Sequence, residues 1–178
     1  MPVLSPADNN SGATASPAHV RTEFELTVRA PYSVAFPLFG PDGERSWAGT
    51  DWDPRCVYPS PAADIQGVVF TVKHGVHQAV WVNTVFDQEG HHIQYAYFIS
   101  EVMVTTINLT FQSLDPADTK VSVVYERTAL NVAASKHVQQ FAAADQERGA
   151  NWEKAINAYF QKHPQLVSLP NPGRGRSV

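Results

Sequence analysis

The chain has 178 residues, 43% hydrophobic and 17% charged, with a formal net charge of −4, and this length and apolar content suit one domain with a packed core. Its 13 basic residues form no cluster except Arg174 and Arg176, which argues against nucleic-acid binding. The single cysteine, Cys56, excludes an internal disulfide, and no apolar run is long enough to span a bilayer.

The two ends differ in composition from the rest of the chain. Residues 1–20 are rich in Ser, Ala, Pro and Asn and lack the basic and apolar segments of a secretory signal, so we expect a disordered leader on a cytoplasmic protein. Residues 164–178 carry three prolines and two glycines, which predicts a flexible tail. The body, residues 21–163, is expected to form a single domain.

The first elements of the body are short. Residues 23–28 alternate between apolar and polar side chains, which predicts a strand. Pro31 suits the first turn of a short helix over residues 32–39. The stretch 44–61 predicts a second short helix or loop, followed by an irregular strand at residues 55–58.

Longer strands with period-two alternation follow, and short turns separate them. Consecutive strands joined in this way predict an antiparallel meander, with one inward face of apolar and aromatic side chains interrupted by a few polar groups. The strands are expected at residues 68–74, 78–86, 93–101, 105–112 and 121–128.

Residues 135–162 close the pattern with one amphipathic helix about 42 Å long. Asp145 and Arg148 fall inside its apolar stripe. Strands followed by one long helix predict an α+β fold in which the helix lies across the concave face of a curved sheet and leaves a cavity for a small molecule. The predicted stripe consists of Val138, Phe141, Trp152, Ala155, Ile156 and Tyr159.

Several short segments carry a resemblance to a known family. Glu44-Arg45-Ser46-Trp47 and Trp52-Asp53-Pro54 are fairly specific together; residues 58–59, 67–70, 73–75, 80–82 and 152–159 also match. Over nearly all of residues 21–161 the chain resembles the SRPBCC (START-like) superfamily, in the branch labelled polyketide cyclase/dehydrase and lipid transport. The resemblance implies the helix-grip fold, a curved antiparallel sheet wrapped around a long C-terminal helix with two short helices near the N-terminus. It also implies a hydrophobic ligand between sheet and helix, but it does not specify any one reaction.

Polar side chains at inward positions are the candidates for chemistry, because a buried charge needs a protein partner or a ligand. A cyclase needs an acid/base next to a carbonyl and a donor for the developing enolate. His74 is the candidate acid/base, and Tyr95, Tyr97 or Arg127 is the candidate donor. The candidate ligand-binding residues are Trp47, Trp52, Phe70, Trp81, Tyr95, Glu101, Tyr125, Phe141, Asp145, Arg148 and Trp152.

Structural roles compete with these assignments. Asp145 and Arg148 are three residues apart, a spacing that favours a salt bridge within the helix or one to the sheet. Arg127 lies near the end of its strand, where it can reach water. His74 precedes a glycine at a turn, which favours a structural hydrogen bond.

The segment before the meander also has a structural interpretation. Trp47 and Trp52 are expected to pack and to anchor a loop over the cavity mouth, while Glu44 and Arg45 are expected to brace this segment.

The histidines of residues 74–92 differ in strand parity and no carboxylate completes a ligand set, so neither a metal ion nor a cofactor is predicted.

Two hypotheses for the function remain open. The first is a binding module for a hydrophobic or aromatic small molecule, such as a lipid or a polyketide-like metabolite. The second is a polyketide cyclase/dehydratase-like enzyme that uses acid/base residues in the same cavity. A weaker third is a protein–protein adaptor, which an exposed apolar patch on the sheet exterior would favour. We expect a monomer or homodimer, with neither nucleic acid nor an integral membrane segment as a partner.

Overall fold

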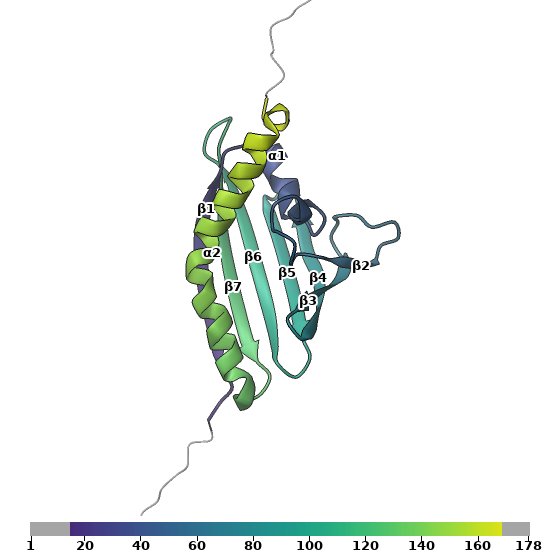
Figure 1. Cartoon of the computed structure of the whole chain (residues 1–178), viewed down its shortest axis with the longest axis vertical. Helices are drawn as coiled ribbons and strands as arrows, with labels where there is room; N and C mark the ends of the chain where they lie inside the picture. The colour runs from purple at the N-terminus through teal and green to yellow at the C-terminus, as the bar shows by residue number, and fades with distance from the viewer. Residues whose placement is uncertain (1–14, 169–178) are drawn as a thin grey trace, which may run out of the picture.

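The computed structural model describes residues 15–168, so the expectations for residues 1–14 and 169–178 lie outside the described part of the chain. One curved seven-stranded sheet forms the main layer (Figure 1). Strands β2 to β7 are consecutive neighbours in an antiparallel meander, and β1 pairs with β7 at the other edge. The strands are β1 (His19–Val28), β2 (Arg55–Tyr58), β3 (Val69–His74), β4 (His77–Asp87), β5 (His92–Ile99), β6 (Met103–Ser113) and β7 (Thr119–Ala129).

The short helices lie between β1 and β2. The helix expected over residues 32–39 is present as two pieces, α1 (Tyr32–Ala35) and the 3₁₀ helix η1 (Phe36–Phe39). Pro37 explains the division, because it has no N–H to donate to the carbonyl four residues earlier. The remaining 3₁₀ helices are η2 (Gly43–Ser46), η3 (Val132–Ala134) and η4 (Pro164–Leu166).

The long helix α2 (Ser135–Lys162) has the bounds that the sequence predicts. It packs along β1 and β7 (Figure 1). Gly149 allows this close approach, since a Cβ there would lie 3.0 Å from Phe24 Cδ2 and 3.1 Å from the Glu25 carbonyl oxygen. In the described part of the chain, no helix is both long and apolar enough to cross a membrane.

The buried face of α2 differs from the predicted stripe. Phe141 and Trp152 are only partly buried because they border a cavity, and Tyr159 is partly exposed while its neighbour Phe160 is buried. The helix therefore has two inward faces, one that packs on β1 and one that looks across the sheet. The buried positions are Val138, Ala142, Asp145, Gly149, Ile156 and Phe160.

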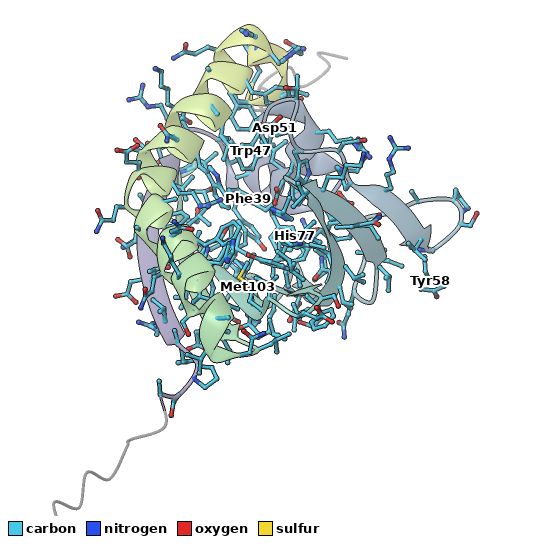
Figure 2. All side chains as sticks on the ribbon, turned by 60° about the horizontal axis from the view of Figure 1, so that its bottom comes forward. Phe39, Trp47, Asp51, Tyr58, His77 and Met103 are labelled. Carbon is cyan, nitrogen blue, oxygen red and sulfur yellow. The ribbon has the colours of Figure 1, made fainter. Side chains whose placement is uncertain are left out.

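The strand register arranges inward side chains in rows across the sheet. Aromatic side chains stand on the β3–β5 side and an arginine on β7, while the α1–η1 end of the concave face is filled by Phe36, Phe39 and Phe111. One row consists of Phe70, Trp81, Tyr97, Thr105 and Arg127. The next consists of Asn83, Tyr95, Ile107 and Tyr125. Figure 2 shows Phe39 and Trp47 between α2 and the sheet, and Tyr58 at the far edge.

Candidate functional site

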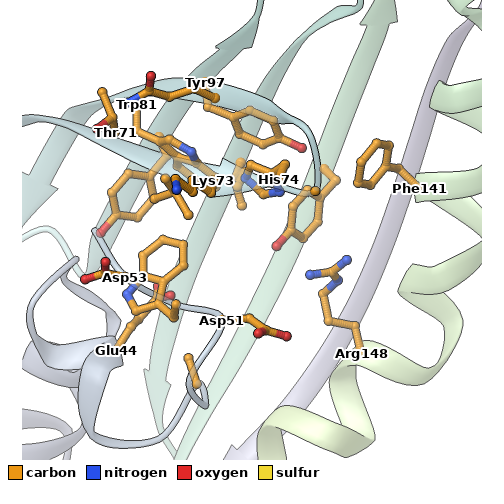
Figure 3. A pocket seen from close by; sticks show the side chains of 18 of the residues that line it. Glu44, Asp51, Asp53, Thr71, Lys73, His74, Trp81, Tyr97, Phe141 and Arg148 are labelled. Carbon is orange, nitrogen blue, oxygen red and sulfur yellow. The ribbon is translucent and has the colours of Figure 1, made fainter. Parts of the chain in front are cut away.

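A cavity of about 740 Å³ lies between α2, the concave face of the sheet and the segment that follows η2 (Figure 3). The exposed side chains of Asp51, Asp53 and Lys73 border it, so it opens to solvent on that side. The structure brings eleven of the fourteen predicted site residues into its wall. They are Trp47, Trp52, His74, Trp81, Tyr95, Tyr97, Tyr125, Arg127, Phe141, Arg148 and Trp152.

Three predicted site residues do not line the cavity. Phe70 is buried in the core and stacks against Trp81, with ring centroids 5.7 Å apart. Asp145 is buried under α2 between two arginines. The inward position expected for Glu101 is wrong: β5 ends at Ile99, and Glu101 is exposed in the following turn with φ +60°.

All four tryptophans of the chain line this cavity. Trp47 and Trp52 are fixed by their indole N–H groups, which donate to the Leu38 carbonyl at 2.7 Å and the Pro41 carbonyl at 2.9 Å. Trp47 also meets Trp152 of α2 edge to face, with a centroid distance of 5.3 Å. The loop after η2 is therefore tied to the short helices and to α2, as its predicted anchoring role requires.

A stacked aromatic wall covers the β3–β5 side of the cavity. The Trp81 and Tyr97 rings lie 4.1 Å apart at 19°, and the His74 and Tyr97 rings lie 5.7 Å apart at 11°. The structural hydrogen bond expected for His74 is absent, because its buried Nε2 has no partner among residues 15–168. Burial, together with the charge of Arg148, lowers the pKa of His74, which favours the neutral imidazole.

Asp145 joins α2 to the sheet through a buried ion-pair network. Its carboxylate accepts from Arg127 Nη1 at 2.5 Å and Nη2 at 3.0 Å, from Thr22 Oγ1 at 2.5 Å and from Arg148 Nε at 2.9 Å. The alternative that Arg127 reaches water is wrong, since only 1% of it is exposed. The salt bridges expected for Asp145, within the helix and to the sheet, are both present.

This network leaves one positive charge at the cavity. Two guanidinium groups face one carboxylate, and Arg127 directs both of its Nη atoms at it, while the buried Nε of Arg127 has no partner among residues 15–168. Arg148 uses only Nε on Asp145, and within residues 15–168 its Nη atoms form no hydrogen bond. Figure 3 shows the Arg148 guanidinium reaching from α2 toward the cavity. Arg148, rather than Arg127, is thus the arginine available to a guest molecule.

The hydroxyl groups on the wall are not equivalent. The Tyr95 hydroxyl donates to the Phe39 carbonyl at 2.6 Å, so its proton is already used. Tyr97 and Tyr125 form no side-chain hydrogen bond within the described residues, and the buried indole N–H of Trp81 likewise has no partner there. These groups are free to serve a polar guest.

Glu44 is the cavity residue whose location the sequence interpretation missed. It lines the cavity, is 8% exposed and has no side-chain hydrogen bond to any described residue. Burial and nearby Asp64 raise its pKa well above the usual value, while Arg148 acts in the opposite direction. One feature of the sequence could have located it. Residues i and i+3 of a 3₁₀ helix lie on the same side, and Glu44 stands three residues before the buried Trp47, so Glu44 is expected on the inward side with it.

Two other features bear on the possible functions. Within residues 15–168, no three His, Cys, Asp or Glu side chains are grouped as metal ligands would be.

On the convex face of the sheet, Val80, Phe98 and Val104 form a cross-strand row, each 37–43% exposed. Thr71 and Thr128 flank this row, so the apolar patch is short for a protein interface.

No protein-family model matches the sequence, and no curated protein matches it either. Solved structures do match the fold. A norcoclaurine synthase point mutant from Thalictrum flavum has a TM-score of 0.63 and 12% identity, over 85% of this chain and 99% of that one. The Zhui aromatase/cyclase from Streptomyces sp. R1128 has a TM-score of 0.61 and 15% identity, over 85% and 97%.

The protein Ara h 8.0201 is a further match, with a TM-score of 0.57 and 14% identity over 82% of this chain and 99% of that one. Together with the curved antiparallel sheet and the long C-terminal helix, these likenesses confirm the START-like helix-grip fold that the sequence predicts. At these identities they establish the fold alone.

Proposed function

We propose that the chain binds an aromatic small molecule in the cavity between α2 and the sheet. The observation that carries this proposal is the gathering of all four tryptophans around one solvent-open cavity of about 740 Å³. A guest that buries 150–250 Å² of apolar surface there gains roughly 4–6 kcal/mol before the costs of association. The cavity is large enough for a molecule of two or three fused rings.

The polar groups favour an oxygenated aromatic guest over a plain hydrocarbon. Arg148 carries the surplus positive charge, and Tyr97 has a free hydroxyl beside the stacked wall. A carbonyl, phenol or phenolate oxygen would satisfy both. The fold neighbours support this class, since norcoclaurine synthase from Thalictrum flavum has been solved with dopamine and hydroxybenzaldehyde, and another neighbour is an aromatase/cyclase.

Ligand binding can be tested with 2-acetylnaphthalene and the protein's own tryptophan fluorescence. We expect saturable quenching, and an affinity about tenfold weaker in Arg148→Leu because a hydrogen bond to a charged group is lost. Arg21→Leu, on an exposed arginine of β1, is the matched control and should bind like wild type. Absence of quenching up to the solubility limit, with no small molecule released from freshly purified protein in native mass spectrometry, would contradict binding.

A second candidate, an acid/base enzyme of the cyclase/dehydratase type, is favoured by His74. This imidazole lines the same cavity as Tyr97 and Arg148, and its lowered pKa favours the neutral form that can accept a proton. Since Arg127 is engaged by Asp145, Arg148 replaces it as the donor for a developing enolate.

The enzymatic candidate predicts proton removal next to a bound carbonyl. In D₂O, the acetyl methyl signal of 2-acetylnaphthalene should decay faster with wild-type protein than with His74→Ala, as followed by ¹H NMR. If the methyl signal decays at the rate seen in buffer alone while the protein is saturated with the ketone, the enzymatic candidate is contradicted and ligand binding remains the proposed function.

A further inference from the structure

Glu44 is held firmly at the cavity wall by its short helix. Its backbone N–H donates to the Gly40 carbonyl at 2.9 Å, and its own carbonyl accepts from the Ala48 N–H at 2.8 Å. A Cβ on Gly43 would lie 2.0 Å from the Pro37 carbonyl oxygen, so this glycine lets η2 pack directly on η1. The backbone at Glu44 is therefore held in place by the packing of η2 on η1.

Two other carboxylates near Glu44 already have partners, and a third, Asp51, is exposed to solvent. Asp64 accepts from the backbone N–H groups of Asp42 and Gly43 at 3.0 and 3.1 Å. Asp53 pairs with Arg45 and Arg55. Glu44, more than nine-tenths buried, has no such partner in the described chain. Its carboxyl oxygens are not among the fully buried unpaired atoms, so they are accessible from the cavity, where a bound molecule can supply the missing partner.

The charged and titratable groups around Glu44 come from several elements. Asp64, in the loop before β3, disfavours a second negative charge, and Arg148 on α2 favours one. Tyr95 on β5 and Tyr125 on β7 are neutral phenols whose own pKa values are raised, first by burial. Burial is the largest influence on the pKa of Glu44 and shifts the equilibrium toward the protonated carboxyl, which has an O–H that can donate into the cavity.

We propose that Glu44 is a ligand-facing hydrogen-bond donor, and that it selects aromatic ligands with a neutral carbonyl oxygen at the end opposite Arg148. This inference rests on the proposed ligand binding and narrows its chemical class. Figure 3 places Glu44 and Arg148 on opposite sides of the cavity. Whatever group of the ligand lies at the Arg148 end, the oxygen at the Glu44 end should be uncharged because Asp64 is near.

The test uses two fluorescent naphthalenes that differ in one group. The ketone 6-propionyl-2-(dimethylamino)naphthalene emits at longer wavelength when its carbonyl accepts a hydrogen bond, and N,N-dimethyl-2-naphthylamine lacks the carbonyl. In Glu44→Leu we expect the ketone to bind about five- to tenfold more weakly with a blue-shifted emission, and the amine to bind within about twofold of wild type. Glu44→Gln, which keeps a neutral donor, should retain ketone binding.

Raising the pH tests the same group in the wild-type protein, with Glu44→Gln as the control. Wild-type affinity for the ketone should fall as Glu44 ionises, while Glu44→Gln should show no such fall; because this variant retains His74, whose pKa is lowered, it also accounts for any contribution of the imidazole. An unchanged ketone-to-amine affinity ratio in Glu44→Leu, or in wild type at high pH, would overturn the inference while leaving ligand binding intact. Failure of wild type to bind either probe would overturn both.

Discussion

Replacing Asp145 by asparagine should strongly destabilise the fold, because this carboxylate is the counter-charge of a buried arginine. Arg127 and Asp145 are 1% and 2% exposed, and the carboxylate accepts four hydrogen bonds. An asparagine keeps the size but turns an N–H₂ group toward donors. We expect a loss of about 3–5 kcal/mol in the free energy of unfolding, the usual cost of leaving a buried charge unpaired.

For a chain of this size, such a loss corresponds to a decrease of about 6–20 °C in Tm. Urea unfolding followed by far-UV circular dichroism measures it directly. Glu147→Gln removes an exposed carboxylate from the same helix and should change stability by less than about 0.5 kcal/mol.

A double variant separates the pair from its surroundings. Arg127→Met combined with Asp145→Leu removes both charges, and it should recover much of the stability that Asp145→Asn alone loses. If Asp145→Asn costs less than about 1 kcal/mol, Arg127 has access to water in solution and the buried network described above is wrong.

Three further substitutions or titrations test separate contacts. Gly149→Val should lose about 1–3 kcal/mol in urea unfolding because the new side chain meets Phe24, and unchanged stability would contradict the close approach of α2 to β1. Glu44 has a folded-state pKa above its unfolded value of about 4.5, so the folded state holds more protons between the two values and stability falls as pH rises. Glu44→Gln should therefore gain stability relative to wild type from pH 4.5 upward, and parallel urea-unfolding stability profiles would refute the raised pKa. His74 should titrate below its usual pKa of 6.5 in NMR, with burial as the main cause, and a midpoint at or above 6.5 would show that the ring is solvated.

The parts of the fold that the sequence predicts well are those with one continuously buried face. Period-two alternation locates β6 and β7, and the 3.6-residue period locates α2, because each element repeats one environment along its length. The same alternation fails at Glu101, where the strand has ended and the turn changes the direction of the side chain.

The candidate site is predictable only where strand parity decides it. Tyr95, Tyr97 and Tyr125 follow from alternation, since their neighbours on the same face are apolar. The partner of Arg127 lies on a different element, and no local pattern shows that Asp145 reaches it. Glu44 stands on a single 3₁₀ turn, too short for a period to be recognised, and only the packing of that turn on η1 makes it a wall residue.

Whether the cavity admits an aromatic guest is tested most directly by ¹H–¹⁵N NMR of the indole N–H groups. The chain has four tryptophans and all of them line the cavity, so four indole signals report on it from different sides. Titration with 2-acetylnaphthalene should move these signals in a saturable way, with a shift at Trp81, whose buried N–H has no partner within residues 15–168. Four indole signals that stay in place up to the solubility limit, in folded protein, would contradict the proposed ligand-binding cavity.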